Sequence, residues 1–151
     1  MESTSSKDGQ SPISVLIEAT PERVFATLIN VAAHTDWASG PLEIRDLSEN
    51  PAQMGTTFQQ VGKIVGKTIV AECQVNIYEE NRRFGFNGNK PFPFQVAWEL
   101  EPASGGTQLT MTGQLEPDGF FKIAAPILNN SLESQMEADL LTLKALLEAE
   151  D

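Results

Sequence analysis

The chain has 151 residues, of which 40% are hydrophobic, and this length fits one globular domain with a sizeable core. Its formal net charge is −11, and its ten lysines and arginines are scattered along the sequence. Because such a surface repels phosphate groups, a nucleic-acid partner is not expected.

The cysteine and histidine contents limit the chemistry further. Cys73 is the only cysteine and His34 the only histidine, so neither an internal disulfide nor a conventional His/Cys metal site is expected, and no cofactor is implied. Residues 1–11 are polar, and the chain has no run of 18 apolar residues. We therefore expect a cytoplasmic protein without a membrane span, with a disordered tail over residues 1–11 and a single domain over residues 12–151.

The first two predicted elements follow one another almost without a linker. Alternating apolar residues predict a strand over 13–17. Thr20 is a suitable N-cap, Pro21 suits the first helical position, and apolar residues then recur on one face, which predicts a helix over about 21–29. A second short helix is expected over 31–39, before a Gly-Pro pair ends it.

Antiparallel strands are expected from residue 42 to residue 115. A long hairpin turns near Val65 and Gly66, because glycine supplies the positive φ that a tight turn needs. Its second arm carries an apolar face formed by Ile69, Ala71, Cys73, Val75 and Ile77. Alternation is cleanest over 94–101 and continues over 109–115, so the sheet has one apolar and one polar face.

The last part of the chain predicts a long amphipathic helix over 127–149, which Pro126 begins or kinks. Its apolar stripe consists of Leu128, Leu132, Met136, Leu140, Leu143 and Leu147. The acidic residues Glu133, Glu137 and Asp139 are expected on the solvated side of this helix.

These elements predict an α+β fold in which a curved antiparallel sheet of six to seven strands wraps around the C-terminal helix. A straight helix touches a curled sheet along only part of its length, so a cavity is expected between them. The two short helices after the first strand would close one side of that cavity.

Four segments carry a resemblance to a known superfamily. They are "IEATPERVFATLIN" (17–30), Trp37, "WELEPASGGTQLT" (98–110) and "LESQMEADLLTLKALLEAE" (132–150). Over residues 12–149 the chain resembles the START-related helix-grip superfamily, SRPBCC, and within it the polyketide cyclase/dehydrase-like branch. The resemblance implies the helix-grip fold and an apolar ligand pocket beneath the C-terminal helix, and it carries no catalytic residue over to this sequence.

Polar residues expected near the pocket have two interpretations each. Gln60 shares a face with Phe58 and would either orient a ligand carbonyl or hydroxyl, or place its amide in water, which the sequence favours. His34 would either act as a general base at the pocket mouth, or lie on the surface at the end of a short helix, which is again favoured. Cys73, between apolar neighbours, is expected to be a small buried residue rather than a reactive thiol.

The expected ligand-binding wall combines these residues with the aromatic and aliphatic residues of the inner faces. Its members are His34, Trp37, Phe58, Gln60, Cys73, Val75, Phe84, Phe86, Val96, Trp98, Met111, Phe121, Leu128, Leu132 and Met136. Because few titratable groups are expected to face inward, the sequence favours binding of a small hydrophobic molecule, lipid-like or polyketide-like. The alternatives are a polyketide cyclase or dehydrase and a protein-interaction module similar to the chaperone-activator branch.

Overall fold

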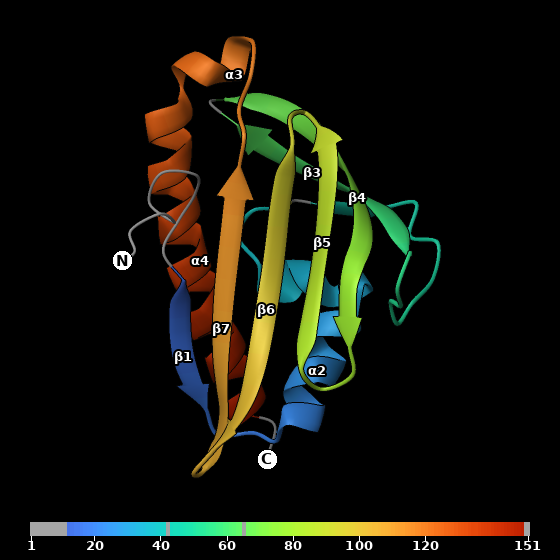
Figure 1. Cartoon of the computed structure of the whole chain (residues 1–151), viewed down its shortest axis with the longest axis vertical. Helices are drawn as coiled ribbons and strands as arrows, with labels where there is room; N and C mark the ends of the chain where they lie inside the picture. Colours follow the sequence, from blue (N-terminus) through green and yellow to red (C-terminus); the bar gives the residue numbers. More distant parts are fainter. Residues whose placement is uncertain (1–11, 42, 65, 150–151) are drawn as a thin grey trace.

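The computed structural model of the chain describes residues 12–41, 43–64 and 66–149, apart from the side chain of Phe120. The disordered tail expected over residues 1–11 lies outside these residues, as do residues 150 and 151 of the expected domain. All the described strands belong to one sheet, and the helices cover its concave face (Figure 1).

The sheet has seven antiparallel strands in the order β1-β7-β6-β5-β4-β3-β2. The strands are β1 (Ile13–Ile17), β2 (Glu43–Arg45), β3 (Thr57–Ile64), β4 (Lys67–Glu79), β5 (Arg83–Lys90), β6 (Phe94–Ala103) and β7 (Gly106–Leu115). From β2 to β7 the strands form a meander of hairpins, whereas β1 pairs with the last strand, so β1 and β2 lie at opposite edges. The predicted hairpin turn is confirmed at Gly66, whose φ is +81°.

Two β-bulges bend the sheet between β4 and β5. One extra residue lies in β5 between the pairs Glu72↔Lys90 and Gln74↔Asn87, and another lies in β4 between Val75 and Ile77. Bulges increase local twist and curvature, which gives the sheet a concave face. The second bulge also changes the predicted alternation, because Tyr78 replaces Ile77 on the inner face and packs edge-on against Phe25 at 5.4 Å between ring centroids.

Two short helices follow β1, as predicted. Thr20 caps α2 (Pro21–Ile29) by accepting a hydrogen bond from the backbone N–H of Arg23 at 3.2 Å, and Pro21 occupies the first turn. The 3-10 helix η1 (Val31–Asp36) comes next and ends at Trp37. The apolar face of α2, formed by Val24, Phe25 and Leu28, is buried against the sheet.

The C-terminal segment forms a short helix and a long one. The short helix α3 (Phe120–Ile123) leads into α4 (Ala125–Glu148), with Pro126 in the first turn, where its missing N–H is not needed. The predicted stripe of α4 faces the sheet, and Gly113 of β7 lets the helix approach closely, because a Cβ there would lie 3.1 Å from Leu132 Cδ2 and 3.2 Å from Met136 Sδ.

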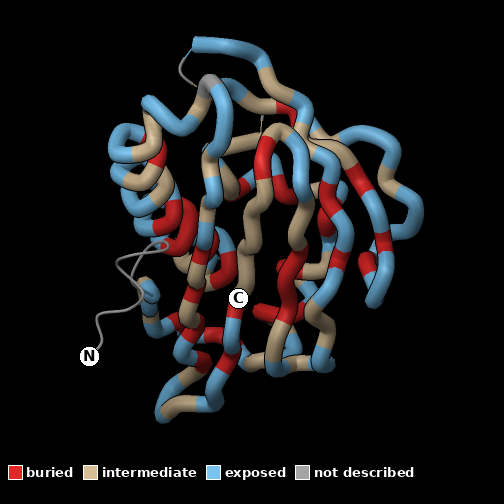
Figure 2. Tube along the Cα trace, turned by 45° about the horizontal axis from the view of Figure 1, so that its top comes forward, coloured by how far each residue is buried: buried red, intermediate tan, exposed pale blue. Residues whose placement is uncertain are grey.

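The end of α4 is fastened to β1. Lys144 Nζ donates to the backbone carbonyl of Leu16 at 2.8 Å, and the backbone N–H of Glu18 donates to Glu148 Oε2 at 2.9 Å. Lys144 and Glu148 also form an ion pair at 2.7 Å. Buried residues gather between the sheet and α4, whereas the end that carries α3 is mostly exposed (Figure 2). Among the described helices, none combines the length and the apolar character needed to cross a bilayer.

Candidate functional site: a cavity beneath the C-terminal helix

A cavity of about 420 Å³ lies between the concave face of the sheet and the first half of α4. This volume is in the range of small-molecule sites. Its wall is drawn from η1 and the loop after it, from the strands β3 to β7, from the loop between β5 and β6, and from α4.

Most of the ligand-binding residues predicted from the sequence border this cavity. They are His34, Trp37, Gln60, Phe86, Val96, Trp98, Met111, Leu128, Leu132 and Met136. The other predicted residues do not line it. Phe58, Cys73, Val75 and Phe84 belong to the buried core, and Phe121 packs against the lining residue Phe92 at 5.3 Å between ring centroids. The structure thus gathers ten of the fifteen predicted residues around one cavity and leaves the other five outside its wall.

His34 is 1% exposed, so the interpretation of a surface histidine is wrong. Its Nε2 lies 2.7 Å from the backbone oxygen of Leu28. Because a carbonyl oxygen only accepts, Nε2 carries the proton and Nδ1 keeps its lone pair. Burial lowers the pKa of His34 from 6.5 to about 4, although the bond to Leu28 acts in the opposite direction, so the ring is neutral at physiological pH.

Two tryptophans stand beside this histidine. The ring centroid of His34 is 4.9 Å from that of Trp37 and 6.2 Å from that of Trp98, and the two indoles meet edge-to-face at 5.9 Å. Phe84, the partner of Trp98 on the neighbouring strand β5, stacks on its ring at 6.0 Å between centroids. Within the described part of the chain, neither Trp37 Nε1 nor Trp98 Nε1 has a hydrogen-bond partner, although both are buried.

Asp139 is a cavity residue that the sequence interpretation missed. The helical pattern predicts it on the solvated side of α4, yet it is 6% exposed and borders the cavity. Its Oδ1 accepts a hydrogen bond from the backbone N–H of Ser39 at 2.8 Å, which fastens the loop after η1 to the helix. Burial raises the pKa of this carboxyl, and the Ser39 bond opposes that effect. The available signal was its spacing of three residues from Met136, since such residues share a helix face.

Gln60 on β3 and Cys73 on β4 were both predicted on the inner face of the sheet, and the structure gives them different surroundings. Gln60 borders the cavity and is only partly buried, so its amide stands at the wall rather than wholly in water. Cys73 is 4% exposed, and burial raises the pKa of its thiol to about 12. A thiol with so high a pKa supplies almost no thiolate, in agreement with the structural role expected for it.

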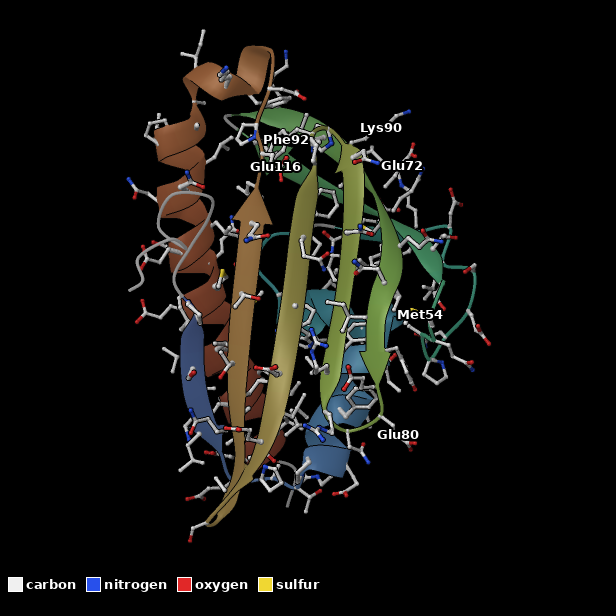
Figure 3. The ribbon with its side chains drawn as sticks, viewed as in Figure 1. Met54, Glu72, Glu80, Lys90, Phe92 and Glu116 are labelled. Carbon is white, nitrogen blue, oxygen red and sulfur yellow. The ribbon has the colours of Figure 1, made fainter. Side chains whose placement is uncertain are left out.

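The cavity is partly open to solvent, and its exposed lining residues include Ile127 and Ser131 near the end of the molecule that carries α3. Its lining includes the exposed residues Lys63, Ser131 and Gln135, and Gly40 faces Gln135, because a Cβ added there would lie 3.1 Å from Gln135 Oε1. Phe92, in the loop between β5 and β6, lies beneath α3 at this end, far from Glu80 at the opposite end (Figure 3). The site is thus a mainly apolar cavity, partly open to solvent, with a few polar groups on its wall.

These polar groups define the chemistry available. The Nδ1 of the neutral imidazole can accept a hydrogen bond, the amide of Gln60 can donate or accept, and the carboxyl of Asp139 can exchange a proton. Over residues 12–41, 43–64 and 66–149, no three His, Cys, Asp or Glu residues are grouped so that they could hold a metal ion.

A family model described as "Polyketide cyclase / dehydrase and lipid transport" matches residues 12–148. The chain belongs to this family. The match spans the described fold from β1 to the last residue of α4, and it agrees with the resemblance found in the sequence. No protein of curated function matches the sequence.

Solved structures share the fold of this polyketide cyclase/dehydrase family member. TTHA0849 from Thermus thermophilus is 17% identical with a TM-score of 0.75, and the match covers 93% of this chain and 98% of that one. The Zhui aromatase/cyclase from Streptomyces sp. R1128 is 15% identical with a TM-score of 0.75, over 91% and 92% of the two chains. The di-domain ARO/CYC BexL from the BE-7585A biosynthetic pathway is 15% identical with a TM-score of 0.72, over 93% of this chain and 50% of that one.

Proposed function

We propose that this protein binds a small, largely apolar molecule, lipid-like or polyketide-like, in the cavity beneath α4. The observation that carries the proposal is the cavity itself, which is about 420 Å³ in volume and bordered mainly by aromatic and aliphatic side chains. An apolar molecule gains free energy by leaving water for such a wall, and a few polar groups then fix its orientation. The family description, which includes lipid transport, supports the same role.

A cavity-filling substitution tests this proposal directly. Ala71 borders the cavity, so Ala71→Phe would place a ring inside it. Val70, the preceding residue on β4, is 39% exposed, so Val70→Phe adds the same ring where no cavity wall is occupied. With the fluorescent probe 1-aminoanthracene, we expect Ala71→Phe to weaken binding at least about tenfold and Val70→Phe to leave it unchanged.

Two outcomes would contradict the proposal: no binding of the probe to the unmodified protein, or equal affinity in both variants. Circular dichroism of each variant checks that the fold is retained. Native mass spectrometry of the protein purified from its own host without denaturation would then identify the class of molecule, through a bound mass that solvent extraction removes.

A polyketide cyclase or dehydrase is the second candidate function, and Asp139 is the observation that favours it. Cyclisation of a poly-β-ketone requires removal of a proton from carbon and its delivery to a carbonyl oxygen, which a carboxyl with a raised pKa can perform. Two of the similar structures, Zhui and BexL, are described as aromatase/cyclases. A protein-interaction role needs no cavity, and nothing in the site favours it.

The variant Asp139→Asn separates binding from catalysis, because an amide oxygen still accepts the hydrogen bond from Ser39. If the protein is a cyclase, a synthetic poly-β-ketone thioester will bind to both forms, and only the unmodified protein will convert it to an aromatic product. Binding of the thioester without conversion by the unmodified protein would exclude this second function for that substrate.

A further inference from the structure

Two isoleucines near the junction of α3 and α4 are exposed to a degree that the binding function does not explain. Ile123 is 88% exposed and Ile127 is 61% exposed, although large aliphatic side chains gain free energy by leaving water. A single exposed residue of this kind is common, but these two lie four residues apart, and Ile127 also borders the cavity. An apolar surface beside a binding site is a candidate for contact with a partner.

The segment that carries these isoleucines is almost free of charge. Residues 119–132, which include α3 and the first two turns of α4, contain a single charged residue, Lys122. The whole chain has 21 acidic residues against ten basic ones, so a segment of this length without a carboxylate differs from the rest of the protein. This segment therefore does not repel an anionic partner, whereas most of the chain would.

Four of the six lysines in the sequence gather around the same end of the molecule. Lys122 belongs to α3, and Lys63 borders the cavity. Lys67 begins β4 on the other arm of the hairpin, whose turn lies at the end that carries α3 (Figure 1). Lys90 lies close to Phe92 at this end (Figure 3), and all four lysines are exposed. The α3 tip consists of Lys63, Lys67, Lys90, Lys122, Ile123 and Ile127.

Carboxylates are also present near the α3 tip, and they limit its positive charge. Glu116 and Asp118 precede α3, and Glu72 forms an ion pair with Lys90 at 4.0 Å. Both side chains of this pair are more than half exposed, so the pair is weak and leaves the lysine available to another anion. The lysines thus keep this end from sharing the strong negative charge of the chain as a whole.

Charges at the opposite end of the molecule, where Glu80 lies, are too distant to oppose a contact at the α3 tip (Figure 3). α4 has 24 residues, which gives it a length of about 36 Å. At physiological ionic strength the Debye length is about 8 Å, so a charge one helix length away is screened. The local composition of the α3 tip, rather than the net charge of −11, therefore decides what this end can approach.

We propose that the α3 tip docks on the surface of an anionic lipid bilayer. Ile123 and Ile127 insert at the boundary between head groups and acyl chains, and the lysines face the anionic head groups. Contact with a bilayer combines these two kinds of interaction, since aliphatic side chains enter the boundary region while exposed lysines are attracted to the anionic surface. The contact is peripheral and reversible.

Docking in this orientation connects the bilayer to the cavity. Ile127 and Lys63 belong both to the α3 tip and to the lining of the cavity, so the exposed rim of the cavity would face the lipid. An apolar molecule dissolved in the bilayer then has a shorter path through water on its way to the site. The inference adds a partner to the proposed binding function, and its test does not require a ligand in the cavity.

Sedimentation with vesicles tests the inference on the full chain. Vesicles of phosphatidylcholine and phosphatidylglycerol in a molar ratio of about 7:3 provide the anionic surface, and vesicles of phosphatidylcholine alone provide the neutral reference. We expect the protein to bind the anionic vesicles at least about fivefold more strongly. We also expect this binding to weaken at least about tenfold between about 0.05 M and about 0.5 M NaCl, because salt screens the lysines.

Two pairs of variants locate the contact. Ile123→Ser removes the most exposed isoleucine of the tip and should weaken vesicle binding at least about fivefold, whereas Leu141→Ser removes a 55% exposed leucine on the C-terminal half of α4 and should leave it unchanged. Lys122→Glu should weaken binding about tenfold. Arg82→Glu changes the net charge equally, but near Glu80 at the opposite end, and should have little effect. Circular dichroism confirms that each variant is folded.

The cavity-filling variant Ala71→Phe separates docking from uptake of a lipid into the cavity. We expect it to bind the anionic vesicles like the unmodified protein, even where it no longer binds 1-aminoanthracene. Loss of vesicle binding in this variant would assign the interaction to the cavity and overturn the inference.

Three further results would also overturn it: no binding of the unmodified protein to the anionic vesicles, equal binding to both kinds of vesicle, or equal effects within either pair of variants. None of these results bears on the binding of 1-aminoanthracene, so the proposed binding function can stand when the docking inference fails. Conversely, failure of the unmodified protein to bind 1-aminoanthracene would contradict the binding function and leave the vesicle measurements to decide the docking.

Discussion

The two halves of α4 lie along the same sheet, yet one half closes against it and the other leaves a cavity. In the C-terminal half Leu140, Leu143 and Leu147 are at most 1% exposed, and Lys144 and Glu148 fasten the helix to β1. In the N-terminal half, residues 125–136, the buried residues are Leu128 and Met136, and both border the cavity, while Ile127 is 61% exposed. Similar apolar spacing in one helix thus gives two different kinds of packing.

The difference in packing arises from the position of α2, the helix that follows β1, rather than from α4 itself. At the end of the sheet near the C-terminus of α4, α2 fills the concavity with Val24, Phe25 and Leu28 (Figure 1). No described helix takes the equivalent place toward the opposite end, so the curvature of the sheet is left partly unfilled there. A helix-grip protein can therefore set the size of its cavity by the position of the short helices that follow the first strand.

Leucine truncations in the two halves are expected to show the largest contrast. Leu143→Ala removes a fully buried side chain from the closed half and should cost about 3–4 kcal/mol of unfolding free energy. Leu132→Ala enlarges a space that already exists and should cost about 1 kcal/mol or less. Urea denaturation measures both values, and equal losses would show that the two halves are equally well packed.

The pH dependence of stability tests the boundary between the halves, where His34 binds Leu28 of α2 and borders the cavity. Because the folded state holds the pKa of His34 near 4, the unfolded chain takes up the proton first as the pH falls. The neutral, buried His34 therefore contributes to the free energy of unfolding fully above pH 6.5. This contribution is lost progressively down to about pH 4, for a total of about 3 kcal/mol.

The variant His34→Gln provides the reference for this measurement, since it keeps a side-chain donor that cannot titrate. The carboxyl groups titrate in both proteins and largely cancel. The stability difference between the unmodified protein and the variant should therefore fall by about 3 kcal/mol from about pH 7 to about pH 4. A difference that stays constant would mean that His34 is not buried in its neutral form.

A smaller effect is expected at Asp139, which joins the middle of α4 to the loop after η1. Asp139→Leu leaves the backbone N–H of Ser39 without its acceptor and should cost about 1–2 kcal/mol. Asp139→Asn keeps an acceptor and should change stability by less than about 0.5 kcal/mol. Thermal unfolding measures the loss of stability in each variant. Equal losses would show that the charge of Asp139, rather than its hydrogen bond to Ser39, is responsible.

Much of this architecture was predictable because it follows from local signals. The cap at Thr20, the proline in the first turn of α2, the positive φ at Gly66 and the stripe of α4 depend only on nearby residues. Strand alternation places Trp98 and Met111 on the inner face, where the structure has them opposite one another on β6 and β7. Seven strands and one long helix then leave few possible arrangements.

The features that escaped prediction depend on distances between elements. His34 is buried because η1 packs against β2 and α2, and the mixed sequence of this six-residue segment does not indicate which of its side chains those elements cover. The bulge after Val75 adds one residue to β4, so parity fails beyond it and brings Tyr78 inward in place of Ile77. Asp139 lies between the stripe and the solvated side of α4, where periodicity alone does not decide.

The pairing of β1 with β7 has a consequence for the order in which the protein folds during synthesis. Ile13 pairs with Met111 and Ile17 pairs with Thr107, so the first strand has no partner until the ribosome has made most of the chain. The helix that covers the concave face is made later still. At a synthesis rate of about 5–20 residues per second, the nascent meander therefore exposes its apolar face for several seconds before α4 can cover it.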